Sequence, residues 1–158
     1  MAIAFTVNGK PRQVDASDMT TLLEVLRNHL GLMGTRYGCG LEQCGCCMVL
    51  LDGQPVYACT RELVSVAGRS VTTVEGLGSA DRPHPIQQAF LDEQAGQCGY
   101  CLSGIVISAK ALLDRNANPS RADIVTALDK HLCRCGAHQR ILRAVERAAA
   151  TMRNGSPA

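Results

Sequence analysis

Four cysteines lie within nine residues of this chain, in the stretch CGLEQCGCC that runs from Cys39 to Cys47. Three of them have the spacing C-x4-C-x2-C, and a further cysteine follows after eleven intervening residues. Plant-type [2Fe–2S] sites use this spacing, because three ligands on one loop let the chain wrap two bridged irons. The spacing therefore predicts a binuclear iron–sulfur cluster with four cysteine ligands, Cys39, Cys44, Cys47 and Cys59.

A zinc site and a group of inert thiols are the alternatives for this first set. Zinc prefers two short pairs of ligands separated by a spacer, and four cysteines in nine residues fit that arrangement poorly. Glycines at positions 38, 40 and 45 allow backbone amides to turn toward the sulfurs of a shielded, negatively charged cluster. Cys46 is surplus, and we expect a small buried thiol beside the cluster, because its use as a ligand would break the spacing.

A second set of cysteines lies in the motifs CGYC and CRC, at Cys98, Cys101, Cys133 and Cys135. Each pair lies between two predicted helices. If these helices pack as two hairpins side by side, both pairs reach the same end of a bundle. A C-x2-C pair with a C-x-C pair is equally compatible with zinc and with an iron–sulfur cluster, so the spacing alone leaves the metal open.

The elements around the first set are short strands and one helix. Asn-Gly and Asp-Gly turns predict hairpins over AIAFTVNGKPRQVDA and CMVLLDGQPVYAC, and SVTTVE is typical of a further strand. Residues 20–32 have leucines at helical spacing, with Thr21 and Glu24 as a capping box and Gly31 at the end. The first half is therefore expected to be a small sheet packed against one helix.

The second half has a helical period throughout. Four segments have helix start and stop signals: PIQQAFLDEQ, SGIVISAKALLDR, SRADIVTALDKHL and AHQRILRAVERAAATMRN. Four helices of this length predict a compact bundle. The fold class is thus α+β, with a first domain over residues 1–76, a linker rich in turn formers over 77–84, and a four-helix domain over 85–158. The four histidines, His29, His84, His131 and His138, are scattered, and we expect capping or surface roles for them.

Composition limits the partners and the compartment. The formal charge is +2, from 16 basic and 14 acidic residues without a long run of either sign, which gives little reason to expect nucleic acid or an anionic membrane. No segment has the length of a membrane span, and the first residues lack the features of a secretory signal. We therefore expect a cytoplasmic protein, where clustered thiols stay reduced and bind metal, with export alongside a signal-bearing partner left open.

Together these motifs resemble one known family. The chain resembles the small iron–sulfur subunit of the molybdenum hydroxylases, the xanthine oxidase and aldehyde oxidase superfamily, from about residue 3 to about residue 150. The matching stretches, in the right order and separation, are YGCGLEQCGCCMVLLDGQPVYAC, HPIQQAF, GQCGYCLSGIV and LCRCGAHQRILRAV. In style they are closest to bacterial enzymes acting on nitrogen heterocycles, such as isoquinoline and nicotinate dehydrogenases.

The resemblance implies a plant-ferredoxin-like β-grasp domain and a four-helix domain, each with one [2Fe–2S] cluster. It implies that the second cysteine set holds the cluster proximal to the molybdenum-pterin cofactor of a large partner subunit, and that the first set holds the distal cluster. Gln97 matches a position whose side chain contacts the pterin, and the backbone near Cys135 is expected close to it. The chain would then relay electrons one at a time from molybdenum to an external acceptor, a flavin subunit or a cytochrome, and contain no catalytic residue itself.

The resemblance leaves some points open. The family usually has glycine at the position of Glu42 and a small residue at that of Cys46, so the loop conformation is in question and a carboxylate near the distal cluster would lower its reduction potential. The substrate of the complex is expected to be an N-heteroaromatic compound or else an aldehyde. The competing functions are a stand-alone ferredoxin-type carrier or redox sensor, and a zinc-binding interaction module.

Overall fold

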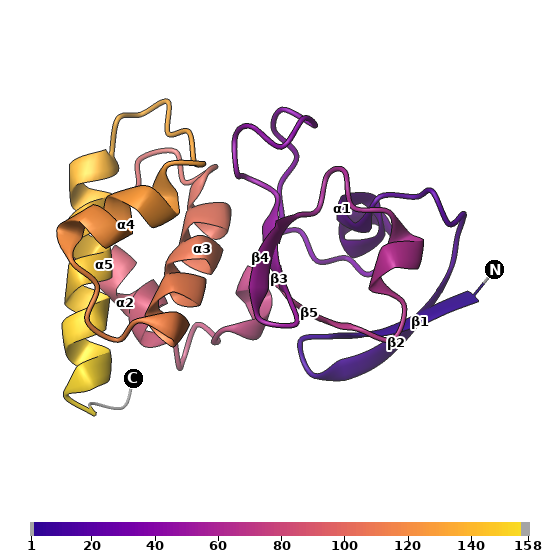
Figure 1. Cartoon of the computed structure of the whole chain (residues 1–158), viewed down its shortest axis with the longest axis horizontal. Helices are drawn as coiled ribbons and strands as arrows, with labels where there is room; N and C mark the ends of the chain where they lie inside the picture. The colour runs from indigo at the N-terminus through magenta and orange to yellow at the C-terminus, as the bar shows by residue number, and fades with distance from the viewer. Residues whose placement is uncertain (1, 156–158) are drawn as a thin grey trace.

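The computed structural model describes residues 2–155. The expected domains begin at residue 1 and end at residue 158, so residue 1 and residues 156–158 lie outside the described range. Figure 1 shows a sheet-containing part and a helical part side by side. The sheet has five strands: β1 (Ala2–Val7), β2 (Lys10–Asp15), β3 (Met48–Leu51), β4 (Gln54–Tyr57) and β5 (Ser70–Thr72). The α+β fold class with a ferredoxin-like sheet domain before a helical domain is confirmed.

The two expected hairpins form the outer pairs of the sheet. Strand order is β2-β1-β5-β3-β4, with β1 and β5 parallel and the other neighbours antiparallel. At the two turns Asn8 and Asp52 have φ values of 51° and 50°, and each is followed by a glycine that also has positive φ. Two consecutive residues with positive φ give the twist that a two-residue hairpin requires, which is why Asn-Gly and Asp-Gly set these turns.

The expected helix over residues 20–32 is only partly α-helical. One turn, α1 (Leu22–Glu24), continues as the π-helical segment η1 (Val25–His29), in which the amide of Leu30 bonds to the carbonyl oxygen of Val25 at 3.1 Å. The hydroxyl of Thr21 accepts the amide of Glu24, so the predicted N-cap is present. Leu22 and Leu26 are fully buried against the sheet, and this packing forms the core of the first domain.

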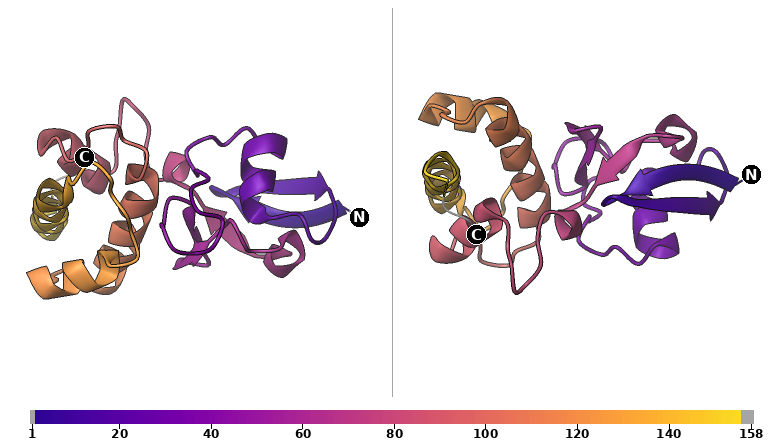
Figure 2. Two further views of the ribbon diagram at one scale, coloured as in Figure 1. Left: turned by 90° about the horizontal axis from the view of Figure 1, so that it is seen from above. Right: turned by 90° about the horizontal axis from the view of Figure 1, so that it is seen from below.

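Two short 3₁₀ segments complete the first half, η2 (Leu63–Val66) and η3 (Val74–Gly76). The second half contains the four predicted helices: α2 (Pro85–Asp92), α3 (Leu102–Arg115), α4 (Arg121–Leu128) and α5 (His138–Arg153). Views from above and below show them grouped away from the sheet (Figure 2). Among the described residues, no helix combines the length and the apolar character needed to cross a lipid bilayer.

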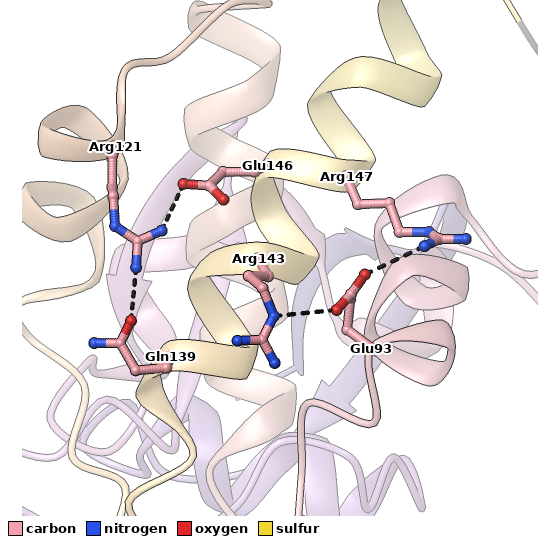
Figure 3. A network of polar contacts seen from close by, with 6 residues as sticks. All are labelled: Glu93, Arg121, Gln139, Arg143, Glu146 and Arg147. Atoms are coloured by element: carbon pink, nitrogen blue, oxygen red, sulfur yellow. Dashed lines mark hydrogen bonds and ion pairs between the residues drawn. The ribbon is translucent and has the colours of Figure 1, made fainter.

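Apolar packing holds the helices together, and charged contacts lie on the outside of the bundle. The aliphatic core includes Ile86, Ile105, Ile124 and Val145 from four different helices. Figure 3 shows the surface network over these helices, in which Arg121 of α4 contacts two side chains of α5 and two arginines of α5 contact Glu93 after α2. Because exposed ion pairs each contribute little to stability, the apolar core contributes more than this network to holding the helices together.

Helix α3 also packs against the sheet domain. Met48 and Leu50 of β3 form an apolar cluster with Ile107 and Ala111 of α3. This contact brings the start of α3 to the side of the sheet domain that carries the first cysteine loop. The inter-domain packing therefore decides how the two cysteine sets face each other.

Candidate iron–sulfur sites

The cysteines lie on loops that gather on one side of the molecule. The loop before β3 carries the first three cysteines of the first set, and Cys59 follows β4. Residues 93–101, before α3, and 129–137, between α4 and α5, carry the second set. In Figure 1 these three loops all lie on the upper side of the chain. The fold thus brings together loops that are far apart in sequence.

Within the first set the thiols meet in pairs. The thiols of Cys39 and Cys44 are in hydrogen-bonding contact, and so are those of Cys47 and Cys59. The second pair is fixed by the hairpin, because the amide of Ala58 donates to the carbonyl oxygen of Cys47 at 3.2 Å. Each iron of a [2Fe–2S] cluster takes two thiolates, so two pairs of thiols are the arrangement that a binuclear cluster requires.

Backbone amides point at the sulfurs of this loop. The amides of Leu41 and Gln43 donate to the sulfur of Cys39 at 3.3 and 3.2 Å. These amides lower the pKa of the Cys39 thiol to about 7. Burial acts in the opposite direction on Cys47 and raises the pKa of its thiol to about 12. A buried thiolate at Cys47 therefore needs a bound cation, whereas Cys39 is prepared for the ionised form by its own loop.

The second set also forms two pairs, one from each loop. Cys98 contacts Cys135, and Cys101 contacts Cys133. The amide of Tyr100 lowers the pKa of Cys98, and burial raises the pKa of Cys101 to about 12. The helical packing thus brings the CGYC and CRC motifs to one end of the bundle, as the sequence predicted.

The loop around Cys133 supplies further donors. Burial is the largest influence and raises the pKa of Cys133, but the amides of Ala137, Cys135 and Gly136 and the Cys101 thiol together lower it below the ordinary value. Amide donors to sulfur are the stabilising contacts that iron–sulfur clusters use. The donor chemistry of both sets therefore fits a [2Fe–2S] cluster.

No three His, Cys, Asp or Glu side chains within residues 2–155 are arranged as ligands of a single metal ion. A binuclear cluster does not need such a group, because each of its irons takes two thiolates and two sulfides. Close packing also limits the first loop, since a Cβ added at Gly38 would lie 2.5 Å from the sulfur of Cys44. Only glycine, which has no Cβ, leaves room at position 38 for the sulfur of Cys44.

Cys46 lies between the two sets. It is buried, with an exposed fraction of 6%, and its thiol contacts that of Cys44. It also lies near Cys101 of the second set, on which it acts electrostatically. Burial raises the pKa of the Cys46 thiol to about 12. The structure therefore places a small buried thiol here, as expected from the sequence, and adds its position between the two sets.

Glu42 adopts the conformation that its usual counterpart, glycine, would favour. Its φ value is 58°, in the left-handed region that glycine adopts without strain. The Glu42 carboxylate accepts a hydrogen bond from the hydroxyl of Thr60, the neighbour of Cys59. The loop therefore keeps a glycine-like backbone, and the carboxylate is held beside the first cysteine set.

His131 does not have the surface or capping role that was expected from the sequence. His84 caps α2 through Nδ1, which accepts the amide of Ile86 at 3.2 Å, as expected of a capping residue. His131 instead has an exposed fraction of 5%, and its Nε2 lies 2.7 Å from the hydroxyl oxygen of Ser108 on α3. Burial lowers the pKa of His131 to about 4. The expectation of a surface or capping role was wrong here, because the ring lies beneath the loop that approaches α3.

Arg36 is a residue that the cysteine spacing did not reveal. Its guanidinium donates to the carbonyl oxygen of Gly99 at 2.6 Å and lies over the Tyr100 ring, 5.3 Å from the centroid. Tyr100 in turn donates its hydroxyl hydrogen to the carbonyl oxygen of Tyr37. These contacts join the two cysteine-bearing regions, and Arg36 adds a positive charge that lowers the pKa of Cys98. Its place directly before the YGCG stretch is the only sequence signal.

Gln97 and Cys135, the two positions that the resemblance placed near the molybdenum cofactor, contact each other. The side-chain amide of Gln97 donates to the carbonyl oxygen of Cys135 at 3.2 Å. Gln97 and Cys98 are both exposed. The second cysteine set therefore opens to the surface at these residues.

Two family models match the chain, one for each half. A "2Fe-2S iron-sulfur cluster binding domain" matches residues 5–70, and a "[2Fe-2S] binding domain" matches residues 73–146. The expected pair of [2Fe–2S]-binding domains is thereby confirmed.

Several curated proteins and solved structures are similar over nearly the whole chain. A nicotinate dehydrogenase subunit of Pseudomonas putida is 55% identical over 151 residues, 96% of each chain, and the alpha subunit of isoquinoline 1-oxidoreductase of Brevundimonas diminuta is 48% identical, over 93% of this chain and 97% of its own. Quinoline 2-oxidoreductase from Pseudomonas putida has a chain that matches with a TM-score of 0.93 and 36% identity, covering 98% of this chain and 97% of that one.

The fold also occurs as part of a longer chain. The aldehyde oxidoreductase of Desulfovibrio desulfuricans matches with a TM-score of 0.94 and 44% identity over 97% of this chain, which corresponds to 17% of that enzyme. Nearly complete coverage of separate small subunits, together with two cluster-binding domains, determines the family. The chain belongs to the small [2Fe–2S] subunits of the molybdenum hydroxylase family and is an iron–sulfur electron-transfer subunit of an oxidoreductase complex.

Proposed function

We propose that each cysteine set binds one [2Fe–2S] cluster, with one thiol pair on each iron. The pairs are Cys39 with Cys44, Cys47 with Cys59, Cys98 with Cys135, and Cys101 with Cys133. The single observation that carries this assignment is that every one of the eight cysteines contacts one partner thiol within its set, while Cys46 is the ninth. When bound, such clusters each accept one electron, and the residues of this chain set burial, amide donation and position.

We divide the chain at the loop 77–84, so that 1–76 forms the domain of the distal cluster and 85–158 that of the proximal cluster. The cluster of the helical domain is proximal because Cys98 of its cysteine set reaches the surface beside Gln97. Gln97 and the backbone of Cys135 would contact the molybdenum-pterin cofactor of the large subunit. Their mutual hydrogen bond supports a shared role, since it fixes the glutamine side chain at the opening of the site.

The complex oxidises an N-heteroaromatic substrate on its large subunit. The support is the similarity to two individual relatives: a nicotinate dehydrogenase subunit is 55% identical and an isoquinoline 1-oxidoreductase subunit is 48% identical. Two aldehyde oxidoreductases are 42% and 40% identical, and a second nicotinate dehydrogenase subunit is 36% identical. A bound distal cluster would supply the exit for electrons toward a flavin subunit or a cytochrome. The relay operates in the cytoplasm.

A stand-alone electron carrier is the second candidate. The enclosed first cysteine set favours this candidate, because the sheet domain by itself contains the four cysteines and the cluster-binding fold of a ferredoxin. The exposed Cys98 and Gln97 favour a role within a complex, because a cluster that opens to water is protected only when a partner covers it.

EPR spectroscopy of the dithionite-reduced protein, purified with whatever binds it and combined with metal analysis, tests these assignments. Two S = 1/2 signals and about four irons per chain are expected from two binuclear clusters. Co-purification of a molybdenum-containing subunit is expected as well. One signal with about two irons would contradict the second assignment, and zinc without a signal would contradict both.

A further inference from the structure

Arg36 reaches from the sheet domain into the loop of the second cysteine set. Its Nη1 atom donates a hydrogen bond of 2.6 Å to the carbonyl oxygen of Gly99, which lies within the CGYC motif. The guanidinium also lies over the ring of Tyr100, 5.3 Å from the centroid, and this cation–π contact limits how far the side chain can move. A cation of the first domain is therefore held against the backbone of the second cysteine set.

The backbone from which this side chain extends is fixed within the first domain. The amide of Arg36 donates to the carbonyl oxygen of Cys46 at 3.3 Å. Directly before it, the carbonyl oxygens of Met33 and Thr35 accept hydrogen bonds from the guanidinium of Arg27 at 2.9 and 2.8 Å. Because these bonds anchor the backbone, the fold and not the side chain alone sets the position of the Arg36 guanidinium.

The carbonyl group that Arg36 binds and the amide that faces Cys98 belong to one peptide group. The amide of Tyr100 donates to the sulfur of Cys98, and the peptide bond joins this amide to the carbonyl of Gly99. The N–H and the C=O of a trans peptide point in opposite directions, so the peptide stands between the guanidinium and the sulfur. Hydrogen bonds in such a chain polarise one another. Donation by a cation to the oxygen therefore makes the N–H a stronger donor to the sulfur.

The charge and the strengthened N–H would act in the same direction on a bound cluster. Reduction adds one electron and so increases the negative charge on the irons and their sulfur ligands. Hydrogen bonds to the sulfurs and a nearby positive charge stabilise the more negative state, so both raise the reduction potential. The thiol responds in the same sense, because the Tyr100 amide, as the largest influence, and the charge of Arg36 both lower the pKa of Cys98.

We propose that Arg36 is a positioning residue of the second cysteine set and raises the reduction potential of the cluster bound there, by polarising the Gly99–Tyr100 peptide toward Cys98. This inference rests on the proposed function, in which the second cysteine set binds a [2Fe–2S] cluster. The first domain thereby supplies a positive charge to the site of the second domain. A higher potential at this site favours its reduction by a donor in the partner subunit.

Redox titration monitored by EPR, on the chain purified with its partner subunits, tests three substitutions of Arg36. Arg36→Met removes the charge and the donor, and the reduction equilibrium constant of the second-set cluster should fall about tenfold, a shift of about 59 mV for one electron. Arg36→Gln keeps a donor without the charge and should lower the potential less. Arg36→Lys keeps the charge and a donor and should restore most of the wild-type potential. The potential of the first-set cluster should change less in all three.

Arg153→Met is the matched control. It removes an arginine that also donates to a main-chain carbonyl oxygen, that of Ala117, at 3.1 Å. Arg153 is the last residue of α5, whereas the second cysteine set lies before the first residue of that helix. A helix of 16 residues is about 24 Å long, so loss of this charge should leave both potentials unchanged.

The outcomes separate this role from a structural one and from the cluster assignment. If Arg36→Met retains both EPR signals and about four irons per chain but keeps the wild-type potential, the role of Arg36 is overturned while the two-cluster function stands. An equal fall in Arg36→Lys and Arg36→Met would also overturn it, and Arg36→Gln serves the comparison if Arg36→Met does not fold. If the unmodified protein contains about two irons per chain and one signal, the two-cluster function itself fails.

Discussion

The two cysteine sets differ in how the chain encloses them. In the first set, Cys44, Cys47 and Cys59 are buried and Cys39 is half-buried. In the second set only Cys101 is buried, Cys133 and Cys135 are half-buried, and Cys98 is exposed. A loop on a sheet can close around its site, whereas two short loops at the end of a helix bundle leave one side open.

This difference indicates that the two cysteine sets have different roles. The chain itself encloses the first cysteine set. The second set is open, and Gln97 and Cys98 are exposed there, near the exposed apolar side chains of Tyr100 and Leu132. Exposed apolar groups around an open site are typical of a surface that a partner covers. The helical domain is therefore the side on which a large subunit is expected to bind.

The largest effect should come from removing one ligand of each set. Cys47→Ala should abolish the EPR signal of the enclosed cluster, and Cys98→Ala that of the open cluster, each reducing the iron content from about four to about two per chain. Cys46→Ala is the matched control and should keep both signals. Loss of iron in the Cys46 variant would contradict the proposed ligand assignment.

Core truncations should reveal whether the two domains unfold together. Leu22 is fully buried beneath the sheet, and Ile105 is buried in the helical bundle. Leu22→Ala and Ile105→Ala should each lower the free energy of unfolding by about 2–5 kcal/mol, because each leaves a cavity. If the two domains unfold independently, urea unfolding followed by circular dichroism should show two transitions, and each substitution should shift only the transition of its own domain. If the contacts of α3 with the sheet couple the domains, each substitution should shift both transitions.

Acid should destabilise the helical domain through His131. The folded ring has a pKa of about 4 because it is buried, whereas an unfolded histidine has a pKa near 6.5. The unfolded chain binds the extra proton between these values, so the stability contributed by the neutral ring is lost as pH falls from 6.5 toward 4, by up to about 3 kcal/mol. Urea midpoints across this range should fall less steeply in His131→Asn, and equal slopes in both proteins would contradict this origin.

The smallest effect should come from the charge beside the enclosed set. Glu42→Gln keeps an acceptor for Thr60 and removes the carboxylate charge. Redox titration monitored by EPR should show the reduction potential of the distal cluster rise by tens of millivolts, equivalent to a Coulomb energy of about 1 kcal/mol, while that of the proximal cluster stays unchanged. An unchanged distal potential would show that solvent screens Glu42 completely.

Much of the fold was predictable because its signals are local. The Asn8–Gly9 and Asp52–Gly53 turns set both hairpins, and caps such as Ser120 mark helix starts. The π-helical turn after Glu24 was not predictable, because a helical repeat of apolar residues does not distinguish hydrogen bonds to the fourth residue from those to the fifth. His131 was misjudged for a similar reason, since its burial depends on α3, which lies more than fifteen residues away along the chain.

The sequence by itself determined the chemistry: thiol type and spacing are covalent facts, and they specified one iron–sulfur motif and restricted the other to two metals. Only the tertiary structure decided which thiols pair, which set stays open, and where the two sets touch. The pairing of Cys98 with Cys135 and the hydrogen bond from Leu132 to Cys44 join residues from separate loops. Such contacts depend on how helices and sheet pack, and packing is a property of the whole chain that no short motif contains.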